Sequence, residues 1–127
     1  MPNNPTIKHQ LLNKSKVILQ DRLNVLQNEF SDLQNTLQSE TKSSAGDKHE
    51  TGRALLQLKR EQLGQQLADI QKQIQMINSI NPKNISNFIT LGSVIETTHQ
   101  NYFISLSLGE IKIKKTSYFA ISPLTPI

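Results

Sequence analysis

The sequence predicts an α+β protein in which an N-terminal antiparallel coiled-coil hairpin is followed by a small antiparallel β domain. Two long segments with heptad-spaced apolar residues indicate the hairpin. Beyond Asn81-Pro82 the apolar residues alternate with a period near two, which is typical of strands. We therefore divide the chain into a hairpin domain over residues 1–81 and a β domain over residues 82–127.

Each helix of the expected hairpin carries two interleaved rows of apolar residues with a spacing of seven. In the first segment the rows are Leu12, Leu19, Leu26 and Leu33, and Leu23, Phe30 and Leu37. In the second segment they are Leu56, Leu63, Ile70 and Ile77, and Leu67 and Ile74. Polar and charged residues dominate the positions between the rows, as a solvated helix face requires. Two helices with such rows are expected to pack along one seam.

A polar break over residues 39–46, which ends in Gly46, separates the two helical segments and indicates a turn. A break of this length favours antiparallel pairing of the two helices. Residues 46–50 are then expected at the tip of the hairpin. Gly64 lies inside the second helical segment, where it should cost about 1 kcal/mol relative to Ala, and the sequence offers no functional reason for it.

Four short strands are expected in the β domain, over residues 91–97, 102–108, 111–114 and 118–122. A small sheet of this kind leaves an unpaired edge, which invites pairing with another chain. We therefore expect either a partner that covers the edge or a β domain that is incomplete in this chain. Lys112, Lys114 and Lys115 indicate a solvated face or a guarded edge.

The composition excludes several classes of function. The chain has 127 residues, of which 35% are hydrophobic and 5% aromatic, so it offers little core material for one compact globule. The net charge of +4 is spread evenly, with 10 basic and 8 acidic residues up to Asn81 and 4 and 2 beyond it, so direct binding to duplex nucleic acid is not expected. The lack of cysteine, of a signal peptide and of a long apolar run favours a cytoplasmic protein without membrane association.

The residues with the clearest chemistry are Asp47 and Glu50, which lie three positions apart at the expected start of the second helix. Asp at an N-cap with Glu at N3 resembles a capping box, and both negative charges favour the positive end of the helix dipole. Two carboxylates at this spacing can also share a divalent cation. The two interpretations are compatible, because capping fixes the backbone that presents the acids.

No second group of residues in the sequence predicts an active site. His49, at the turn, is expected to be solvated, and His9 and His99 are isolated from any acidic cluster, so a zinc site is not expected. Ser43-Ser44 has no paired base, and no Gly-rich phosphate loop or nucleophile elbow is present. We expect a protein that is not an enzyme on its own, so a partner must supply most of any catalytic site.

The motif Gly46-Asp47-Lys48-His49-Glu50-Thr51, placed between two heptad segments, resembles the tip of the Gre transcript-cleavage factors of bacterial RNA polymerase. Members of that family carry Gly-Asp-x-x-Glu-Asn at the tip of a coiled coil. The segments Asn101-Tyr102-Phe103-Ile104-Ser105 and Tyr118-Phe119-Ala120-Ile121-Ser122-Pro123 are similar to a Bacteroidetes branch of Gre-like proteins. The resemblance covers nearly the whole chain and implies an FKBP-like β domain.

The resemblance implies a transcription elongation factor that binds RNA polymerase through its secondary channel and promotes cleavage of backtracked transcripts. Asp47 and Glu50 would be its catalytic acids, sharing a magnesium ion only within the polymerase complex, and the factor would carry no cofactor of its own. Contact with nucleic acid would be indirect, through the polymerase, with no small-molecule substrate and with a monomer favoured. The alternatives are a polymerase-binding regulator that does not promote cleavage and a coiled-coil adaptor for protein interactions.

Overall fold

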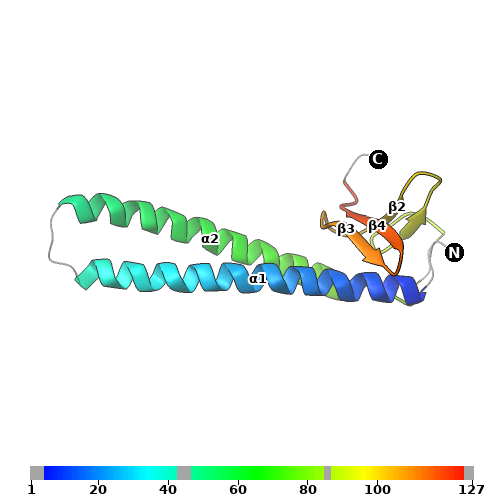
Figure 1. Cartoon of the computed structure of the whole chain (residues 1–127), viewed down its shortest axis with the longest axis horizontal. Coiled ribbons are helices and arrows are strands. Elements are labelled where there is room, and N and C mark those ends of the chain that lie inside the picture. Colours follow the sequence, from blue (N-terminus) through cyan, green and yellow to red (C-terminus); the bar gives the residue numbers. More distant parts are fainter. Residues whose placement is uncertain (1–4, 43–46, 85–86, 125–127) are drawn as a thin grey trace. The chain divides into compact units, whose positions relative to one another are not determined.

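The computed structural model describes residues 5–42, 47–84 and 87–124, and the side chains of residues 6–39, 52–84 and 87–124. Two helices, α1 (Pro5–Lys42) and α2 (Asp47–Ser79), are followed by four strands. The strands are β1 (Val94–Glu96), β2 (Asn101–Ile104), β3 (Gly109–Ile113) and β4 (Thr116–Ile121), as Figure 1 shows. The predicted fold class, a helical hairpin followed by a small β domain, is confirmed.

The chain divides into two compact units, and both helices contribute to each. Unit 1 contains residues 1–19 and 73–127, that is, the first turns of α1, the last turns of α2 and the sheet. Unit 2 contains residues 20–72, the remaining parts of the two helices. The expected boundary near Asn81 divides the chain by secondary structure and stays a prediction.

The helix ends follow local sequence signals. α2 ends at Ser79, just before Asn81-Pro82, as predicted. The backbone N–H of Lys83 donates to Asn81 Oδ1 at 2.9 Å, and the N–H of Asn84 donates to the carbonyl of Asn81 at 3.1 Å, so this segment forms a tight turn. The expected break was too long, because α1 continues through Ser39 to Lys42.

In unit 2, α1 and α2 lie side by side and antiparallel, and apolar side chains join them. The buried residues Leu33, Leu37 and Leu63 form a cluster, and Leu26, Phe30 and Leu56 pack against it. All six belong to the predicted heptad rows. The Arg60 guanidinium carbon lies 5.9 Å from the centre of the Phe30 ring, a cation–π contact that links the two helices at the edge of the cluster.

The sheet in unit 1 has the strand order β1-β2-β4-β3. The pairs β1–β2 and β3–β4 are antiparallel, but β2 and β4 are parallel, with Phe103 opposite Ala120. The prediction of a wholly antiparallel sheet was therefore wrong. The β3–β4 hairpin lies at one edge of the sheet, with β4 and not β3 next to β2. β2 and β4 are not consecutive along the chain, so the sequence near each strand does not indicate that they pair in parallel.

Two strands are shorter than predicted because the backbone turns at their ends. Gly92 has a φ of +92°, so residues 91–93 form a turn and β1 begins only at Val94. β2 ends at Ile104, because the chain bends at residues 105 and 106, although the N–H of Ser105 still donates to the Ile121 carbonyl at 2.7 Å. Leu106 and Leu108 are nevertheless buried. The apolar residues that suggested a longer strand therefore lie in the buried loop between β2 and β3.

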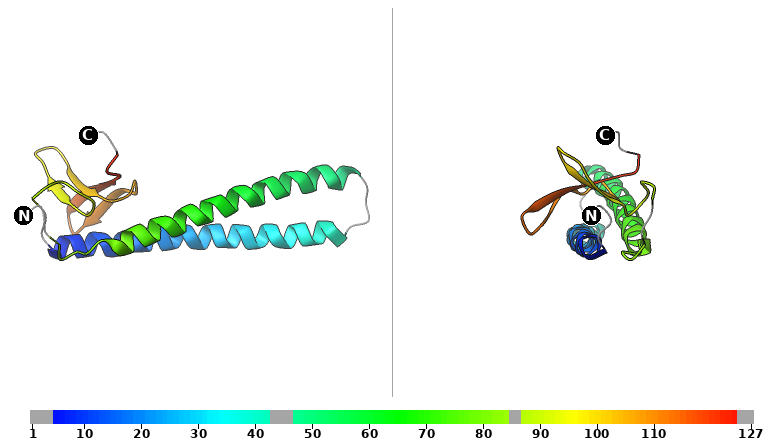
Figure 2. Two further views of the ribbon diagram at one scale, coloured as in Figure 1. Left: turned by 180° about the vertical axis from the view of Figure 1, so that it is seen from behind. Right: turned by 90° about the vertical axis from the view of Figure 1, so that its right-hand side faces the viewer.

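The first turns of α1 bury a second face beside the heptad seam. Lys8, Leu11 and Ser15, at spacings of three and four, are all buried, although none belongs to the predicted rows. The Ser15 hydroxyl donates to the Leu11 carbonyl at 2.7 Å, which satisfies it inside the helix. Figures 1 and 2 show the sheet beside this part of α1, and Lys14 Nζ donates to the Lys112 carbonyl on the edge strand β3.

Gly92, in the loop before β1, lies close to Ile80, the residue that follows α2. A Cβ atom built on Gly92 would lie 2.8 Å from Ile80 Cγ2, a distance that real Cβ atoms do not tolerate. The backbone N–H of Gly92 donates to the Ile104 carbonyl at 2.6 Å, so this residue cannot move away without losing a bond to β2. Gly109 also has a positive φ, of +84°, but a Cβ atom placed there would meet no atom within 4 Å among the described residues.

We predict that Gly92→Ala destabilises unit 1 more than Gly109→Ala does. Both variants strain a left-handed backbone, at about 1–2 kcal/mol, but only Gly92→Ala also overlaps Ile80, which should add about 1–3 kcal/mol. Urea denaturation followed by circular dichroism measures both. A double variant with Ile80→Ala should recover part of the Gly92→Ala loss, and equal losses for the two glycines would contradict the close contact.

We also predict that unit 1 loses stability at alkaline pH through Tyr118. Burial, and then the nearby Glu96 carboxylate, raise the pKa of the Tyr118 hydroxyl above its usual value of 10.0. Above pH 10 the unfolded chain releases this proton while the folded chain retains it, so the free energy of unfolding falls as pH rises. Tyr118→Phe should therefore show a smaller drop in urea midpoint between about pH 8 and pH 11 than the parent protein. An identical drop in both proteins would refute the assignment to Tyr118.

Candidate functional site

The two predicted acids lie at the start of α2. Asp47 is the first residue of the helix, and Glu50 follows three residues later, in its first turn. Their side chains, like those of all residues from 40 to 51, lie outside the described residues. The capping and metal-binding interpretations of Asp47 and Glu50 therefore both stay predictions, and so does the expectation that His49 is solvated.

In unit 2, the helix that carries the two acids packs against α1. Leu37 on α1 is 7% exposed and Leu63 on α2 is 5% exposed, so the seam is closed by apolar contact on the side of unit 2 that leads to the break. Full burial of a Leu side chain is worth about 1.5–3 kcal/mol relative to exposure. The seam therefore joins the helix that ends at Lys42 to the helix that begins at Asp47.

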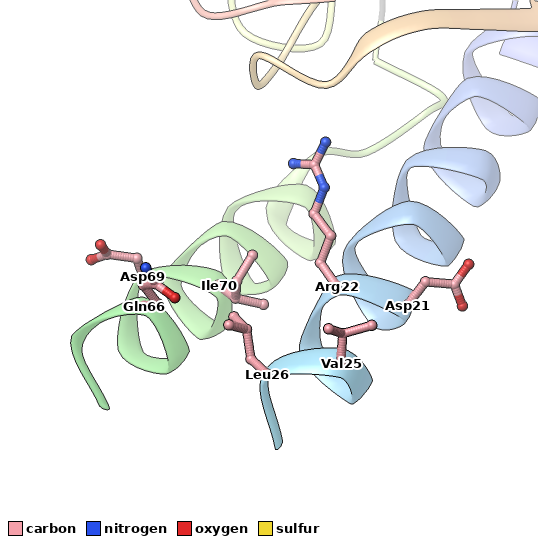
Figure 3. Close-up of a pocket in the computed structure, with 7 residues that line it drawn as sticks. All are labelled: Asp21, Arg22, Val25, Leu26, Gln66, Asp69 and Ile70. Carbon is pink, nitrogen blue, oxygen red and sulfur yellow. The ribbon is translucent and has the colours of Figure 1, made fainter. Parts of the chain in front are cut away.

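A groove of about 540 Å³ opens farther along unit 2, beside the buried Ile70 and the half-buried Leu26. Figure 3 shows Leu26 of α1 and Ile70 of α2 pointing toward one another, while Asp21 and Asp69 point away to opposite sides. Val25, on the rim, is 57% exposed. The groove is apolar and carries charges only at its margins, so it offers no arrangement for chemistry.

Gly64 meets no obstacle in α2. Its Cβ position has no neighbouring atom within 4 Å among the described residues, and the same holds for Gly52 nearer the start of the helix. Neither residue has a positive φ. Gly64 is therefore not required by packing or by backbone conformation, and it lowers the stability of the helix that presents Asp47 and Glu50.

The described residues contain no group of three or more His, Asp or Glu side chains that could hold a metal ion. His9 lies beside Thr6, Pro82 and Lys83, and the backbone N–H of His99 donates to Thr97 Oγ1 at 3.2 Å in the β1–β2 turn. The two histidines thus belong to separate places in unit 1.

A second, polar cavity, in unit 1, was not foreseen from the sequence. It has a volume of about 280 Å³ and is lined by residues from the first turns of α1, the end of α2 and the loop before β1. The lining includes Lys8, which is only 4% exposed. Burial lowers the pKa of Lys8 below its usual value of 10.5, so the charged form is less favoured in the folded protein than in the unfolded chain. A sequence signal existed in the pair Leu11-Leu12, since Leu11 falls outside the heptad rows and marks a second buried face.

Comparisons with protein-family models, with curated proteins and with solved structures find no match for this chain. Over the residues that the structure describes, neither helix combines the length and apolar character that a bilayer crossing requires.

We predict that Gly64→Ala stabilises unit 2. The substitution removes backbone entropy from the unfolded chain and meets no steric conflict, so it should add about 0.5–1 kcal/mol to the free energy of local unfolding. Amide hydrogen exchange across residues 56–72 measures this directly. Gly52→Ala, which is equally unobstructed but lies near the helix start where fraying is easier, should give a smaller gain. Faster exchange in Gly64→Ala would show that the glycine has a structural role.

Proposed function

We propose that this chain is a Gre-type transcription elongation factor that binds RNA polymerase through the secondary channel and promotes cleavage of backtracked transcripts. The observation that carries the proposal is the place of Asp47-x-x-Glu50 in the fold. The motif opens α2 immediately after the break that follows α1, and the two helices pair in unit 2 through Leu33, Leu37 and Leu63. The two acids therefore lie in the first turn of α2, near in sequence to the end of α1.

The dimensions of unit 2 support the proposal. From Gln20 to Lys42 α1 covers roughly 33 Å at 1.5 Å per residue, and α2 returns over a similar length. A paired structure of that length, with most of its described outer positions exposed, can enter a deep channel without unfolding. The sequence between the two helices, residues 43–46, contains no bulky apolar residue.

The chemistry of the acids also fits the proposal. Carboxylate oxygens are suitable ligands for Mg²⁺, which usually binds protein through one or two carboxylates and keeps several waters. A bound magnesium ion would lower the pKa of a water molecule and orient it for hydrolysis. Asp47 and Glu50 would supply oxygen ligands to an ion that the polymerase holds in part.

The intramolecular seam argues against the adaptor alternative. An adaptor that used the heptad rows to bind another protein would need them exposed, but Leu33 and Leu37 are buried against Leu63 of the same chain. A polymerase-binding regulator that does not promote cleavage would have the same architecture. Only a measurement of transcript cleavage distinguishes it from a cleavage factor.

The test is transcript cleavage by stalled, backtracked RNA polymerase in the presence of magnesium. We expect Asp47→Asn and Glu50→Gln each to lower the stimulated cleavage rate about 10- to 100-fold, because each removes an oxygen ligand or its charge. Glu61→Gln is the matched control, since it neutralises an exposed carboxylate on the same helix and should leave the rate unchanged. Binding to the polymerase is measured in parallel.

Each outcome has a definite meaning. Polymerase binding with a cleavage rate that no acid substitution alters would assign the protein as a regulator. A protein that neither binds polymerase nor stimulates cleavage would overturn the proposal.

A further inference from the structure

The cavity in unit 1 brings Lys8, near the start of the chain, together with two neighbouring segments that lie far from it in the sequence. Lys8 comes from α1, Ser79 and Asn81 from the end of α2 and the turn after it, and Thr90 and Gly92 from the loop before β1. The cavity volume of about 280 Å³ lies just below the range that is usual for small-molecule sites, roughly 300–1,000 Å³. A ligand that fits it has only a few heavy atoms.

Lys8 is the one charged group in the described lining, and its charge is not balanced there. Its Nζ donates to the Asn84 carbonyl at 2.9 Å, and an ammonium group has two further N–H donors. Among the described residues, no Asp or Glu lines the cavity. A buried cation without a counter-charge is costly, so the cavity favours an anion that would pair with Lys8.

Two neutral groups can assist Lys8. The Asn81 Oδ1 atom accepts from the Lys83 N–H, which leaves the amide Nδ2 of Asn81 as a donor. Thr90, which carries a hydroxyl group, belongs to the same lining. Ile80 and Leu91 add apolar surface, so the lining suits a ligand with an anionic group and a short hydrocarbon part.

The wall of the cavity is held in place by a network of hydrogen bonds. Ser93 Oγ accepts from the Thr90 N–H at 2.9 Å, and the Ser93 N–H donates to the Thr90 carbonyl at 3.0 Å. The N–H of Gly92 donates to the Ile104 carbonyl at 2.6 Å, which attaches the loop to the sheet. A wall fixed before binding spares the ligand the cost of ordering it.

We propose that this cavity is a binding site for a small organic carboxylate, with Lys8 as the anion-binding residue and Asn81 and Thr90 as supporting donors. One carboxylate carries one negative charge and neutralises the single lysine. A phosphate dianion would bring a second charge for which the described lining has no second cation. The site belongs to unit 1, whereas Asp47 and Glu50 belong to unit 2, so it does not depend on the proposed role in transcription.

The test is an NMR titration of the full-length protein with sodium acetate, with sodium chloride at matched ionic strength as the reference. In the parent protein we expect saturable shifts of the amide resonances of Asn84, Gly92 and Ser93. Lys8→Met keeps the length of the side chain but removes the charge, and it should weaken acetate binding at least about tenfold. Lys14→Met is the matched control, because Lys14 is an exposed lysine on α1 that bonds to Lys112 outside the cavity, and it should bind acetate as the parent does.

A second variant guards against the case in which Lys8→Met fails to fold. Thr90→Val removes one supporting donor without changing the size of the side chain, and it should weaken acetate binding several-fold. Shifts that chloride reproduces, or equal acetate affinity in the parent and in both variants, would overturn the proposal. Tighter binding of inorganic phosphate than of acetate would overturn the assignment to a carboxylate.

Discussion

The close approach of Gly92 to Ile80 is the constraint on which unit 1 depends. It places the backbone of the loop before β1 directly against the side chain that follows α2. The same loop forms two hydrogen bonds to Ile104 of β2. The Gly92 N–H donates to the Ile104 carbonyl at 2.6 Å, and the Ile104 N–H donates to the Ser93 carbonyl at 2.8 Å. One short segment thus connects the residue that follows α2 to the inner strand β2. A side chain at position 92 would have to break either the helix contact or the strand contact.

The polar cavity lies beside that connection. Its lining contains Gly92 and Ile80, together with Lys8 from the second buried face of α1. A purely coiled-coil helix would bury one seam, but the first turns of α1 must face both α2 and the sheet. Lys8 falls on the additional face and is buried with only the Asn84 carbonyl as its bonded partner among the described residues. Burial of the Lys8 ammonium group without a counter-charge destabilises the fold, and a bound anion would reduce that cost.

Unit 2 has a simpler physical basis. Its stability rests on apolar contacts along one seam, centred on Leu33, Leu37 and Leu63, with the Arg60–Phe30 contact at the margin. Leu26 of α1 and Ile70 of α2, both on the seam, also line an open groove. Gly64 further lowers helix stability where no packing demands it. The two proposed activities thus draw on different units, the paired acids on unit 2 and the carboxylate site on unit 1, and each can fail without the other.

The sequence by itself determined the two helices, the four strands in their order along the chain, and the pair Asp47 and Glu50 as the candidate acids. These features are local, since a heptad row, a short alternating run or a contiguous motif is visible within a few turns of chain. Only the tertiary structure decided that β2 and β4 are parallel, that β1 starts as late as Val94, and that Lys8 is buried beside Asn84. Those outcomes depend on contacts between residues up to 76 positions apart, and packing at such distances overrides what any short segment prefers.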